Sequence, residues 1–281
     1  MPFHMTESGP KICRASKQPC PIGGNHFSTK AEAQEAFEAQ LESESKSTIA
    51  SKKIGIFSQL KKTQYEGFYR PETKTLVLSD IDGTLLRGSL ILDHAVMLSQ
   101  RGIVDLGDWP EKWLSDPKNE EYISGLANSY RKNVAGKKES ELHIPEFIQS
   151  VIEDPEKLYS SLERLKRHQE AGHHVLLISG SPSFLVGPFA KIFGFETVAS
   201  RYHRDRFRRL NGNITGMYGA PQKESVVEKM DLGQYDRIIG YGDTVSDAPL
   251  LSVADHSVLV EPNAETLHRM KDLKIHEILN D

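Results

Sequence analysis

The chain has 281 residues, of which 38% are hydrophobic and 26% charged, a composition that allows a packed core and excludes wholesale disorder. Its net charge of -4 argues against bulk nucleic-acid binding, because nucleic-acid-binding domains are usually basic. No apolar run approaches the roughly 20 residues that span a bilayer, and the N-terminus lacks the apolar centre of a signal peptide. We therefore expect a cytoplasmic protein without membrane contact. The two cysteines exclude a framework of several disulfides.

Residues 1 to 71 differ in composition from the rest and are predicted to form an N-terminal extension of unknown role. The first part is rich in Cys, Pro and Gly and should be irregular. A helix is expected to begin at Ser28, which suits an N-cap, and a polar linker follows it.

Two cysteines and a histidine of this extension form a candidate zinc site. Cys13, Cys20 and His26, with His4 as a candidate fourth ligand, offer the thiolate and imidazole groups that bind Zn²⁺. The cysteine spacing is not that of a zinc finger, however. The favoured interpretation is therefore two free thiols in a reducing compartment.

From Thr75 onward, short apolar strands alternate with helices, a pattern typical of a parallel sheet with helices on both faces. A long, mostly helical stretch from about Ser89 to Ala171 separates the first strand from the second. Ser181 and Pro182 are predicted to open the next helix, as N-cap and first helical residue. The expected strands are Thr75–Ser79, His174–Ile178, Phe195–Ala199, Arg237–Tyr241 and Ser257–Val260.

The first of four polar motifs follows the first strand and reads Asp80-Ile81-Asp82-Gly83-Thr84. Positions i and i+2 of a strand share a face, so both carboxylates can point into one site. Gly83 lets the chain leave the strand with a backbone geometry that most residues avoid. The alternative interpretation of the two aspartates is a polar strand end.

The second and third motifs are a serine-glycine pair and a lysine. Ser179 and Gly180 combine a hydroxyl, an open amide and a nearby helix N-terminus, which together suit a phosphate group. The alternative role for Ser179 is a helix N-cap, which Ser181 fills more naturally. Lys223 is the best match for a cation beside the aspartates; the alternatives are a solvated helix residue and Lys229 on the same helix.

The fourth motif is Gly242-Asp243-Thr244-Val245-Ser246-Asp247. Asp243 and Asp247 are four apart, so on a helical turn they lie on one face, although Asp247 also suits a structural role at a helix start. Ligands collect at the carboxyl ends of parallel strands, where all four motifs stand. Two acidic pairs that converge there need cations, and Mg²⁺ and Lys223 are the expected ones.

The order of these motifs resembles that of the haloacid dehalogenase superfamily of phosphohydrolases, over roughly residues 74 to 281. The helical insertion resembles the subgroup that includes phosphoserine phosphatase (subfamily IB), where it forms a cap over the site. The resemblance implies a Rossmann-like α/β core over residues 72–281, with a helical cap at about residues 88–155. It also implies that phosphate and Mg²⁺ equipment, rather than dehalogenase chemistry, is present.

The resemblance also implies a role for each motif residue. Asp80 would be the nucleophile that forms an aspartyl-phosphate, and Asp82 would protonate the leaving oxygen and then activate water. Lys223 would neutralise charge and orient Asp80. Ser179 and Gly180 would bind the phosphoryl oxygens, and the expected Mg²⁺ ligands are Asp80, the Asp82 carbonyl, Asp243 and, through water, Asp247, which is alternatively a partner of Lys223.

Ser89 departs from the phosphoserine phosphatase pattern. It stands near the position where those enzymes carry a glutamate that holds the substrate ammonium group. This difference argues against L-phosphoserine as the substrate.

Residues 201–209, RYHRDRFRR, carry five arginines and a histidine. One interpretation is a docking patch for a polyanionic substrate or partner. The favoured interpretation is a solvated hairpin or loop face, with Tyr202 and Phe207 as packing residues.

The primary prediction is a Mg²⁺-dependent phosphomonoester hydrolase that acts on a small phosphorylated metabolite. A second interpretation is a binding or adaptor protein that uses the N-terminal extension and carries a secondary or silent phosphatase core. A third keeps the aspartyl-phosphate but transfers the phosphoryl group to an alcohol, as a phosphotransferase does. The sequence leaves the substrate, the pathway and the oligomeric state open.

Overall fold

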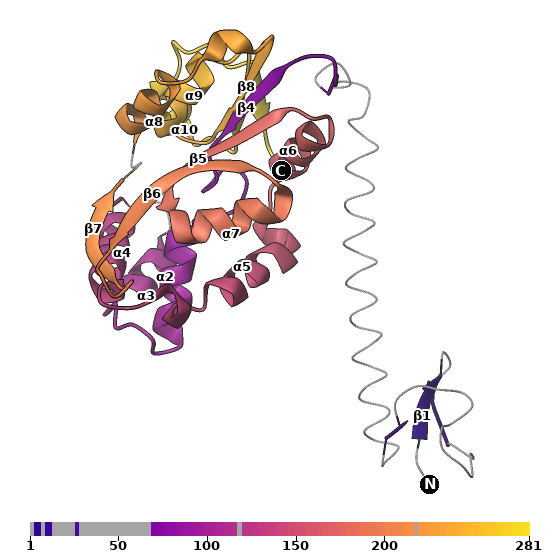
Figure 1. Cartoon of the computed structure of the whole chain (residues 1–281), viewed down its shortest axis with the longest axis vertical. Helices are drawn as coiled ribbons and strands as arrows, with labels where there is room; N and C mark the ends of the chain where they lie inside the picture. The colour runs from indigo at the N-terminus through magenta and orange to yellow at the C-terminus, as the bar shows by residue number, and fades with distance from the viewer. Residues whose placement is uncertain (1–2, 7–8, 13–25, 28–68, 117–119, 217–218) are drawn as a thin grey trace. The chain divides into compact units, whose positions relative to one another are not determined.

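The computed structural model describes residues 3–6, 9–12, 26–27, 69–116, 120–216 and 219–281 (Figure 1). The chain divides into two compact units, residues 1–66 and 67–281. In the first unit, β1 (Phe3–Thr6) pairs antiparallel with β2 (Gly9–Ile12) and with β3 (His26–Phe27).

The predicted zinc ligands fall partly within the described residues. His4 and His26 are register partners between β1 and β3. Cys13, Cys20 and the helix expected after Ser28 lie outside the described residues. The zinc site, the extension and its boundary stay predictions.

The second unit is built on a seven-stranded sheet with the strand order β10-β9-β8-β4-β5-β6-β7. All neighbouring pairs are parallel except β6 and β7, which form an antiparallel hairpin. This sheet confirms the predicted Rossmann-like α/β fold. The strands are β4 (Thr75–Ser79), β5 (His174–Pro182), β6 (Glu196–Arg204), β7 (Leu210–Thr215), β8 (Arg237–Gly242), β9 (His256–Val260) and β10 (Glu277–Leu279).

Apolar cores cover both faces of the central strand β4, because its side chains alternate between the faces. Val77 belongs to a core that includes α6 (Ser160–Glu170) and α7 (Ser183–Phe193). Leu76 and Leu78 belong to a second core with residues of α8 (Ala220–Val227) and α9 (Ala248–Ser252). A short α10 (Ala264–Arg269) follows β9.

The described residues between β4 and α6 form four helices and two short 3-10 turns. Figure 1 shows α2, α3 and α4 beside the β6–β7 hairpin, away from α8, α9 and α10, and α4 contacts β7. Leu126 and Tyr130 of α4 and Phe147 of α5 are buried in the same core as Val77 of β4. The elements are α2 (Leu90–Gln100), α3 (Trp109–Ser115), α4 (Glu120–Val134), η2 (Glu139–Glu141), α5 (Ile144–Glu153) and η3 (Pro155–Lys157).

Several predicted elements differ from those observed. β6 continues past Ala199 to Arg204 because it pairs with β7, so residues 201–209 form the exposed hairpin that was one of the favoured forms. β7 and β10 themselves were not among the expected strands. β5 continues past Ile178 to Pro182, so Ser181 is a strand residue and α7 begins at Ser183. The prediction that Ser181 caps this helix is therefore wrong. Within the described residues, no helix combines the length and the apolar character needed to cross a membrane.

Candidate active site

Three neighbouring strands bring the predicted motifs to one edge of the sheet. β4 lies between β5 and β8, where the chain order reverses, and ligands of open parallel sheets bind at such a switch point. Asp80 follows β4, Ser179 lies in β5, and Asp243 follows β8. We refer to Asp80, Asp82, Asp243 and Asp247 together as the aspartate edge.

Gly83 allows the first and fourth motifs to approach each other closely. Its φ of +83° lies in the left-handed region, which favours glycine. A Cβ at this position would stand 2.2 Å from Asp243 Oδ2, closer than any side chain can tolerate. The next residue, Thr84, donates a hydrogen bond from Oγ1 to Asp243 Oδ1 at 3.1 Å. The loop after β4 therefore both admits and orients Asp243.

Lys223 joins two of the four carboxylates. Its ammonium group donates to Asp80 Oδ1 at 2.8 Å and to Asp247 Oδ1 at 2.6 Å, and its side chain is 3% exposed. Lys229, the alternative cation, is exposed at the end of the same segment. Among the described residues, no group bonds to Asp80 Oδ2, so this oxygen remains available for chemistry.

Asp247 is fully buried, and both of its carboxylate oxygens have partners. Oδ1 accepts from Lys223, and Oδ2 accepts from the backbone amides of Asp243 at 3.1 Å and Thr244 at 3.0 Å. Thr244 also caps the short 3-10 turn η5 (Val245–Asp247). Asp247 is thus an ion-pair partner of Lys223. It also accepts the backbone bonds expected of a structural residue at a helix start.

The Asp82 carboxylate points toward the second motif, which contains Ser179 and Gly180, rather than toward the other aspartates. Its Oδ1 accepts the Leu90 amide at 2.7 Å. Its Oδ2 accepts the hydroxyls of Ser181 at 2.7 Å and Ser179 at 3.2 Å. Ser200 donates to the Gly180 carbonyl at 2.6 Å and ties the motif to β6. These bonds fix the Asp82 side chain at the start of the helical insertion.

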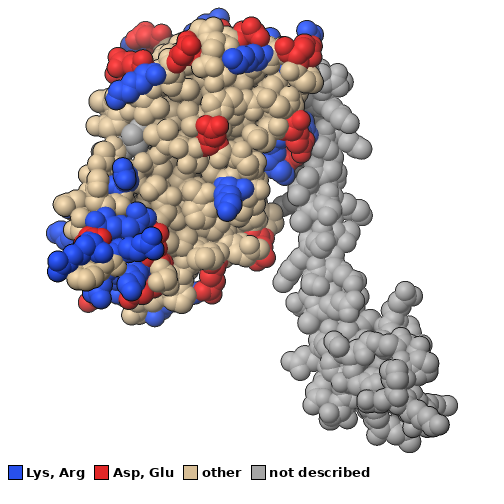
Figure 2. Space-filling view, in the orientation of Figure 1, with Lys and Arg blue, Asp and Glu red and all other residues tan. Residues whose placement is uncertain are grey.

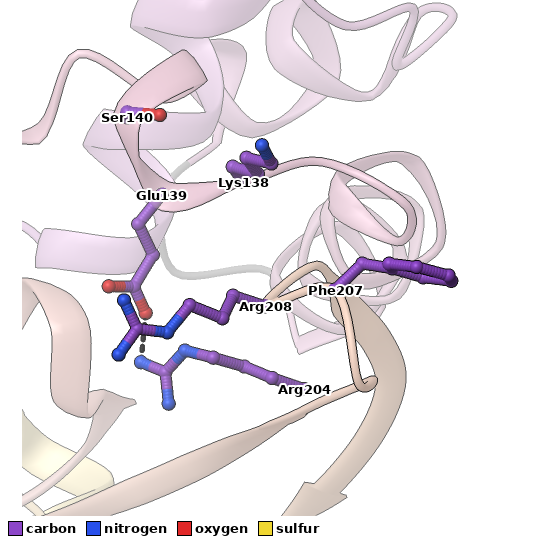
Figure 3. A pocket seen from close by; sticks show the side chains of 6 residues that line it. All are labelled: Lys138, Glu139, Ser140, Arg204, Phe207 and Arg208. Atoms are coloured by element: carbon purple, nitrogen blue, oxygen red, sulfur yellow. Dashed lines mark hydrogen bonds and ion pairs between the residues drawn. The ribbon is translucent and has the colours of Figure 1, made fainter.

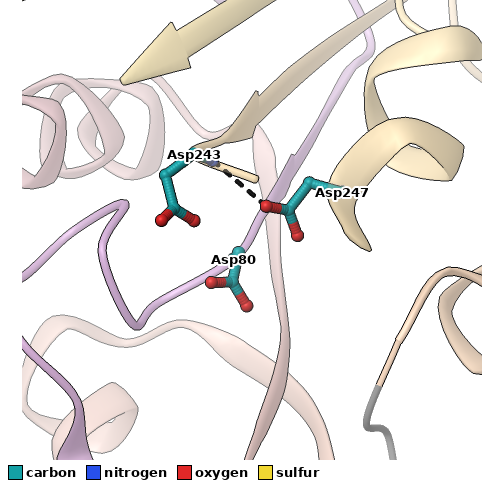
Figure 4. Close-up of side chains that lie close together, drawn as sticks. All are labelled: Asp80, Asp243 and Asp247. Atoms are coloured by element: carbon teal, nitrogen blue, oxygen red, sulfur yellow. Dashed lines mark hydrogen bonds between the residues drawn. The ribbon is translucent and has the colours of Figure 1, made fainter. Parts of the chain in front are cut away.

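Three carboxylates could together hold a metal ion. Oxygens of Asp80, Asp243 and Asp247 lie within 4.8 Å of one another, and Figure 4 shows the three side chains close together. The donor set consists of carboxylate oxygens, which hard divalent cations such as Mg²⁺ prefer. The Asp82 carboxylate is not part of this cluster.

The aspartate edge holds more negative charge than its one lysine neutralises. Burial raises the pKa of Asp80 to about 7, and it raises the pKa values of Asp82 and Asp243 as well, that of Asp243 to well above its usual range. Burial lowers the pKa of Lys223, but the carboxylates of Asp80 and Asp247 outweigh this effect, so the net pKa is raised. A divalent cation at the edge would favour the ionised aspartates.

The structure brings all seven predicted site residues to this edge, and it adds two that the sequence analysis did not assign to the site. Ser181 was expected to cap a helix, yet its hydroxyl makes the shorter of the two serine bonds to Asp82. Thr84 orients Asp243. The signal for Ser181 was its spacing of two from Ser179, since such residues of a strand share a face.

Comparisons with known proteins identify relatives of the chain. Residues 77–252 match the haloacid dehalogenase-like hydrolase family. The chain is 26% identical, over 226 residues, to a histidinol-phosphatase of Neisseria meningitidis serogroup C (strain 8013); the match covers 71% of this chain and 96% of that protein.

Two solved structures share the fold. One is a protein of unknown function from Bordetella pertussis Tohama I, with a TM-score of 0.57, 22% identity, and coverage of 73% of this chain and 98% of that one. The other is a phosphoserine phosphatase in apo form, with a TM-score of 0.51, 15% identity, and coverage of 73% and 93%. Because the family match spans more than half of the sequence, the chain belongs to the haloacid dehalogenase-like hydrolases.

Proposed function

We propose that the protein hydrolyses phosphomonoesters of small metabolites through an aspartyl-phosphate on Asp80, with Mg²⁺ as cofactor. The observation that carries the proposal is the buried bridge of Lys223 between Asp80 and Asp247, beside an Asp82 that two serines position. Family membership and the phosphatases among its relatives make the protein a phosphatase.

In the first step, Asp80 attacks phosphorus through Oδ2, the oxygen that Lys223 leaves available. A bond forms between this oxygen and phosphorus while the bond from phosphorus to the ester oxygen breaks. Lys223 holds Oδ1 and so orients the nucleophile. Asp82 gives its proton to the departing oxygen, and burial, which raises the Asp82 pKa, favours the protonated acid.

In the second step, the ionised Asp82 takes a proton from water, and the water oxygen attacks phosphorus. The bond from phosphorus to Asp80 breaks, and inorganic phosphate leaves. Ser179 and the Gly180 amide are proposed to bind the phosphoryl oxygens during both steps. Because the Ser179 hydroxyl donates its one hydrogen to Asp82 Oδ2 in the structure, it would turn from Asp82 to the phosphoryl group when substrate binds, while Ser181 keeps Asp82 in place.

Asp80, Asp243 and the Asp82 carbonyl would hold Mg²⁺, and Asp247 would contribute through water or through Lys223. The bound cation would neutralise the negative charge that accumulates as phosphoryl oxygens enter the edge. Asp247 suits the indirect role better, because both of its oxygens already accept hydrogen bonds.

The region of Ser89 bears on substrate choice. The Ser89 amide donates to Asp93 Oδ2 at 3.2 Å, and Lys157 pairs with Asp93 Oδ1 at 3.0 Å, so this nearby carboxylate is already neutralised. Ser89 has no carboxylate, and that of Asp93 is already paired, so neither residue offers a free carboxylate to a substrate ammonium group. L-Phosphoserine is therefore not the proposed substrate, and histidinol phosphate belongs among the compounds to test because a relative carries that name.

The test is phosphate release by the full-length protein from a panel of phosphomonoesters that includes L-phosphoserine and histidinol phosphate. We expect release with Mg²⁺ that is abolished by EDTA, and a fall of more than about 10³-fold in Asp80→Asn. The matched control is Asp108→Asn, the same chemical change on a carboxylate whose side chain is 70% exposed in a surface ion pair.

Mass spectrometry of the stopped reaction should find one phosphoryl group on wild type and none on Asp80→Asn. Two results would overturn the proposal: unchanged turnover by Asp80→Asn, or no release from any ester by a folded protein that binds Mg²⁺. Release of a phosphorylated alcohol instead of inorganic phosphate, when an alcohol is supplied, would replace hydrolysis with phosphotransfer.

A further inference from the structure

A pocket of about 570 Å³ lies between the turn of the β6–β7 hairpin and η2, and no residue of the aspartate edge lines it. We call it the basic pocket. Its volume is in the range typical of small-molecule sites. The residues that line it are Lys138, Glu139, Ser140, Arg204, Phe207 and Arg208.

The turn that forms one wall is closed by its single acidic residue. Asp205 Oδ1 accepts the backbone amides of Phe207 at 2.8 Å and Arg209 at 3.0 Å. The Asp205 amide donates to the Arg209 carbonyl at 2.8 Å, which completes the turn. The Asp205 carboxylate therefore accepts hydrogen bonds from backbone amides of the turn. The arginines of the turn are exposed.

Arg208 occupies a backbone conformation that arginine does not favour. Its φ of 63° lies in the left-handed region, which strains a residue with a Cβ and favours glycine. Such strain persists at sites where the side chain has a use. Among the described residues, the Arg208 guanidinium has no hydrogen-bond or ion-pair partner, so the fold itself gains nothing visible from this arginine.

The charges that line the pocket do not balance. Figure 3 shows the side chains of Arg204 and Arg208 running the same way, toward Glu139. Glu139 pairs with Arg204, which leaves Arg208 and Lys138 as excess cations. The lining therefore carries three positive charges and one negative charge, and it is complementary to an anion with two charges.

Two further features distinguish the basic pocket from a surface that merely carries solvated charged side chains: the exposed ring of Phe207 and the density of cations around it. Phe207 was predicted to pack, but it is 59% exposed, so that prediction is wrong; Tyr202, by contrast, is buried against Phe184 as expected. Arg206 lies over the exposed Phe207 ring at 4.7 Å. Figure 2 shows that Lys and Arg gather over this corner, although the whole chain carries a net charge of -4.

We propose that the basic pocket is a binding site for a small phosphate-bearing ligand, held by Arg204 and Arg208, with Lys138 as a further cation of the lining. Guanidinium groups form bidentate, charge-assisted hydrogen bonds with phosphate oxygens, and a lysine adds a point charge. A phosphate or diphosphate group, with about two to three negative charges at neutral pH, matches in sign and approximate size the charge that the lining leaves uncompensated. This inference does not depend on the proposed function, because it rests on a different part of the molecule.

The pocket is a site separate from the aspartate edge. Ser200, which bonds to Gly180 at the edge, precedes Arg204 by four residues of the extended strand β6, a span of about 13 Å. None of the residues that line the pocket belongs to the aspartate edge, and the two sites lie at different points along β6.

The experiment is calorimetric titration of the full-length protein with inorganic pyrophosphate, in EDTA so that no Mg²⁺ occupies the edge. We expect saturable binding that Arg208→Gln and Lys138→Gln each weaken by at least about tenfold. Arg269→Gln, which removes an exposed arginine from α10, is the charge-matched control and should bind like wild type. Acetate, an anion with one charge, should not compete.

Arg208→Gly provides the second variant, because glycine relieves the strain while removing the cation. It should lose binding and keep or raise the melting temperature. Asp80→Asn should bind pyrophosphate like wild type. The proposal is overturned if Arg208→Gly binds unchanged, if Asp80→Asn alone abolishes binding, or if a single-stranded RNA oligomer displaces pyrophosphate through the same arginines, since that would mark a nucleic-acid surface.

Discussion

The aspartate edge and the basic pocket concentrate charge in opposite physical settings. At the edge, Lys223 is 3% exposed and Asp247 fully buried, and both have several partners. At the pocket, the side chains of the Arg204–Glu139 pair are 42% and 34% exposed, and Arg208 has no partner among the described residues. Buried charges must be paired because desolvation is costly, whereas exposed charges add little stability. The edge therefore keeps a buried excess of negative charge that a divalent cation would compensate, whereas the excess positive charge at the pocket is solvated and open to a ligand.

The largest effect is expected from Lys223→Met, which breaks the edge itself. Removal of one partner from a buried ion-pair network costs about 3–5 kcal/mol, because the remaining carboxylates are left without compensation. We expect a matching loss of the free energy of unfolding in urea and loss of phosphatase activity. Lys229→Met, at the exposed end of the same segment, is the control and should leave both unchanged. Equal stability of the two variants would contradict the buried bridge.

A second prediction concerns His94, a buried polar residue of the helical insertion that, like the aspartate edge, has hydrogen-bond partners. His94 is fully buried, with its ring nitrogens 2.8 Å from the Tyr130 hydroxyl and 2.7 Å from the Leu142 carbonyl. Burial lowers its pKa from 6.5 to about 4, so below pH 6.5 the unfolded state binds a proton that the folded state does not. This part of the stability is complete above about pH 6.5 and is lost as the pH falls to about 4.

The size of this acid effect should be on the order of 3 kcal/mol. Urea unfolding at a series of pH values measures it, and His94→Gln should flatten the dependence by that amount. His268→Gln on α10 is the control and should retain the wild-type profile. A His94→Gln profile that parallels wild type throughout would show that the insertion does not depend on a neutral His94.

Gly83→Ala, compared with a matched glycine elsewhere, separates the effect of backbone strain from that of a steric clash with Asp243 at the aspartate edge. The added Cβ would meet Asp243 and displace a carboxylate of the edge, and a displacement of about 1 Å can reduce turnover roughly 100-fold. Gly136→Ala is the matched control, because Gly136 has nearly the same φ, +84°, but no atom within 4 Å of the added group. Both variants should lose about 1–2 kcal/mol from strain. If Gly136→Ala were equally inactive, the close approach at Gly83 would not explain the effect.

The smallest effect is expected on the exposed surface. Glu146→Gln breaks the pair with Arg101, whose side chains are 57% and 40% exposed, and should leave the melting temperature unchanged within error. Glu277→Gln breaks the pair with Arg164, in which both side chains are 12% exposed, and should lower it clearly. A drop for Glu146→Gln as large as that for Glu277→Gln would show that burial does not set the value of these pairs.

Much of the fold was predictable because its signals are local. The apolar run that ends at Ser79 and the polar residues after it mark β4 and its carboxyl end without reference to the rest of the chain. The same reasoning placed the starts of β5, β8 and β9 within a residue or two. The hairpin partner β7 was not predicted, because its alternating, mostly polar residues resemble a loop until β6 lies beside them.

The sequence by itself determined which side chains stand at the strand ends, and hence that Asp80, Asp82 and Asp243 gather at one edge. The expectation that Lys223 also stands at a strand end is wrong, because it reaches the edge from helix α8. Only the tertiary structure decided their bonds: Asp247 to Lys223, and Asp82 to Ser181 rather than to a cation. It also decided that the arginines of the β6–β7 turn face a pocket beside η2. The physical reason is that periodicity and turn chemistry act between neighbours in the chain, whereas hydrogen bonds and charge balance depend on distances between segments that only folding brings together.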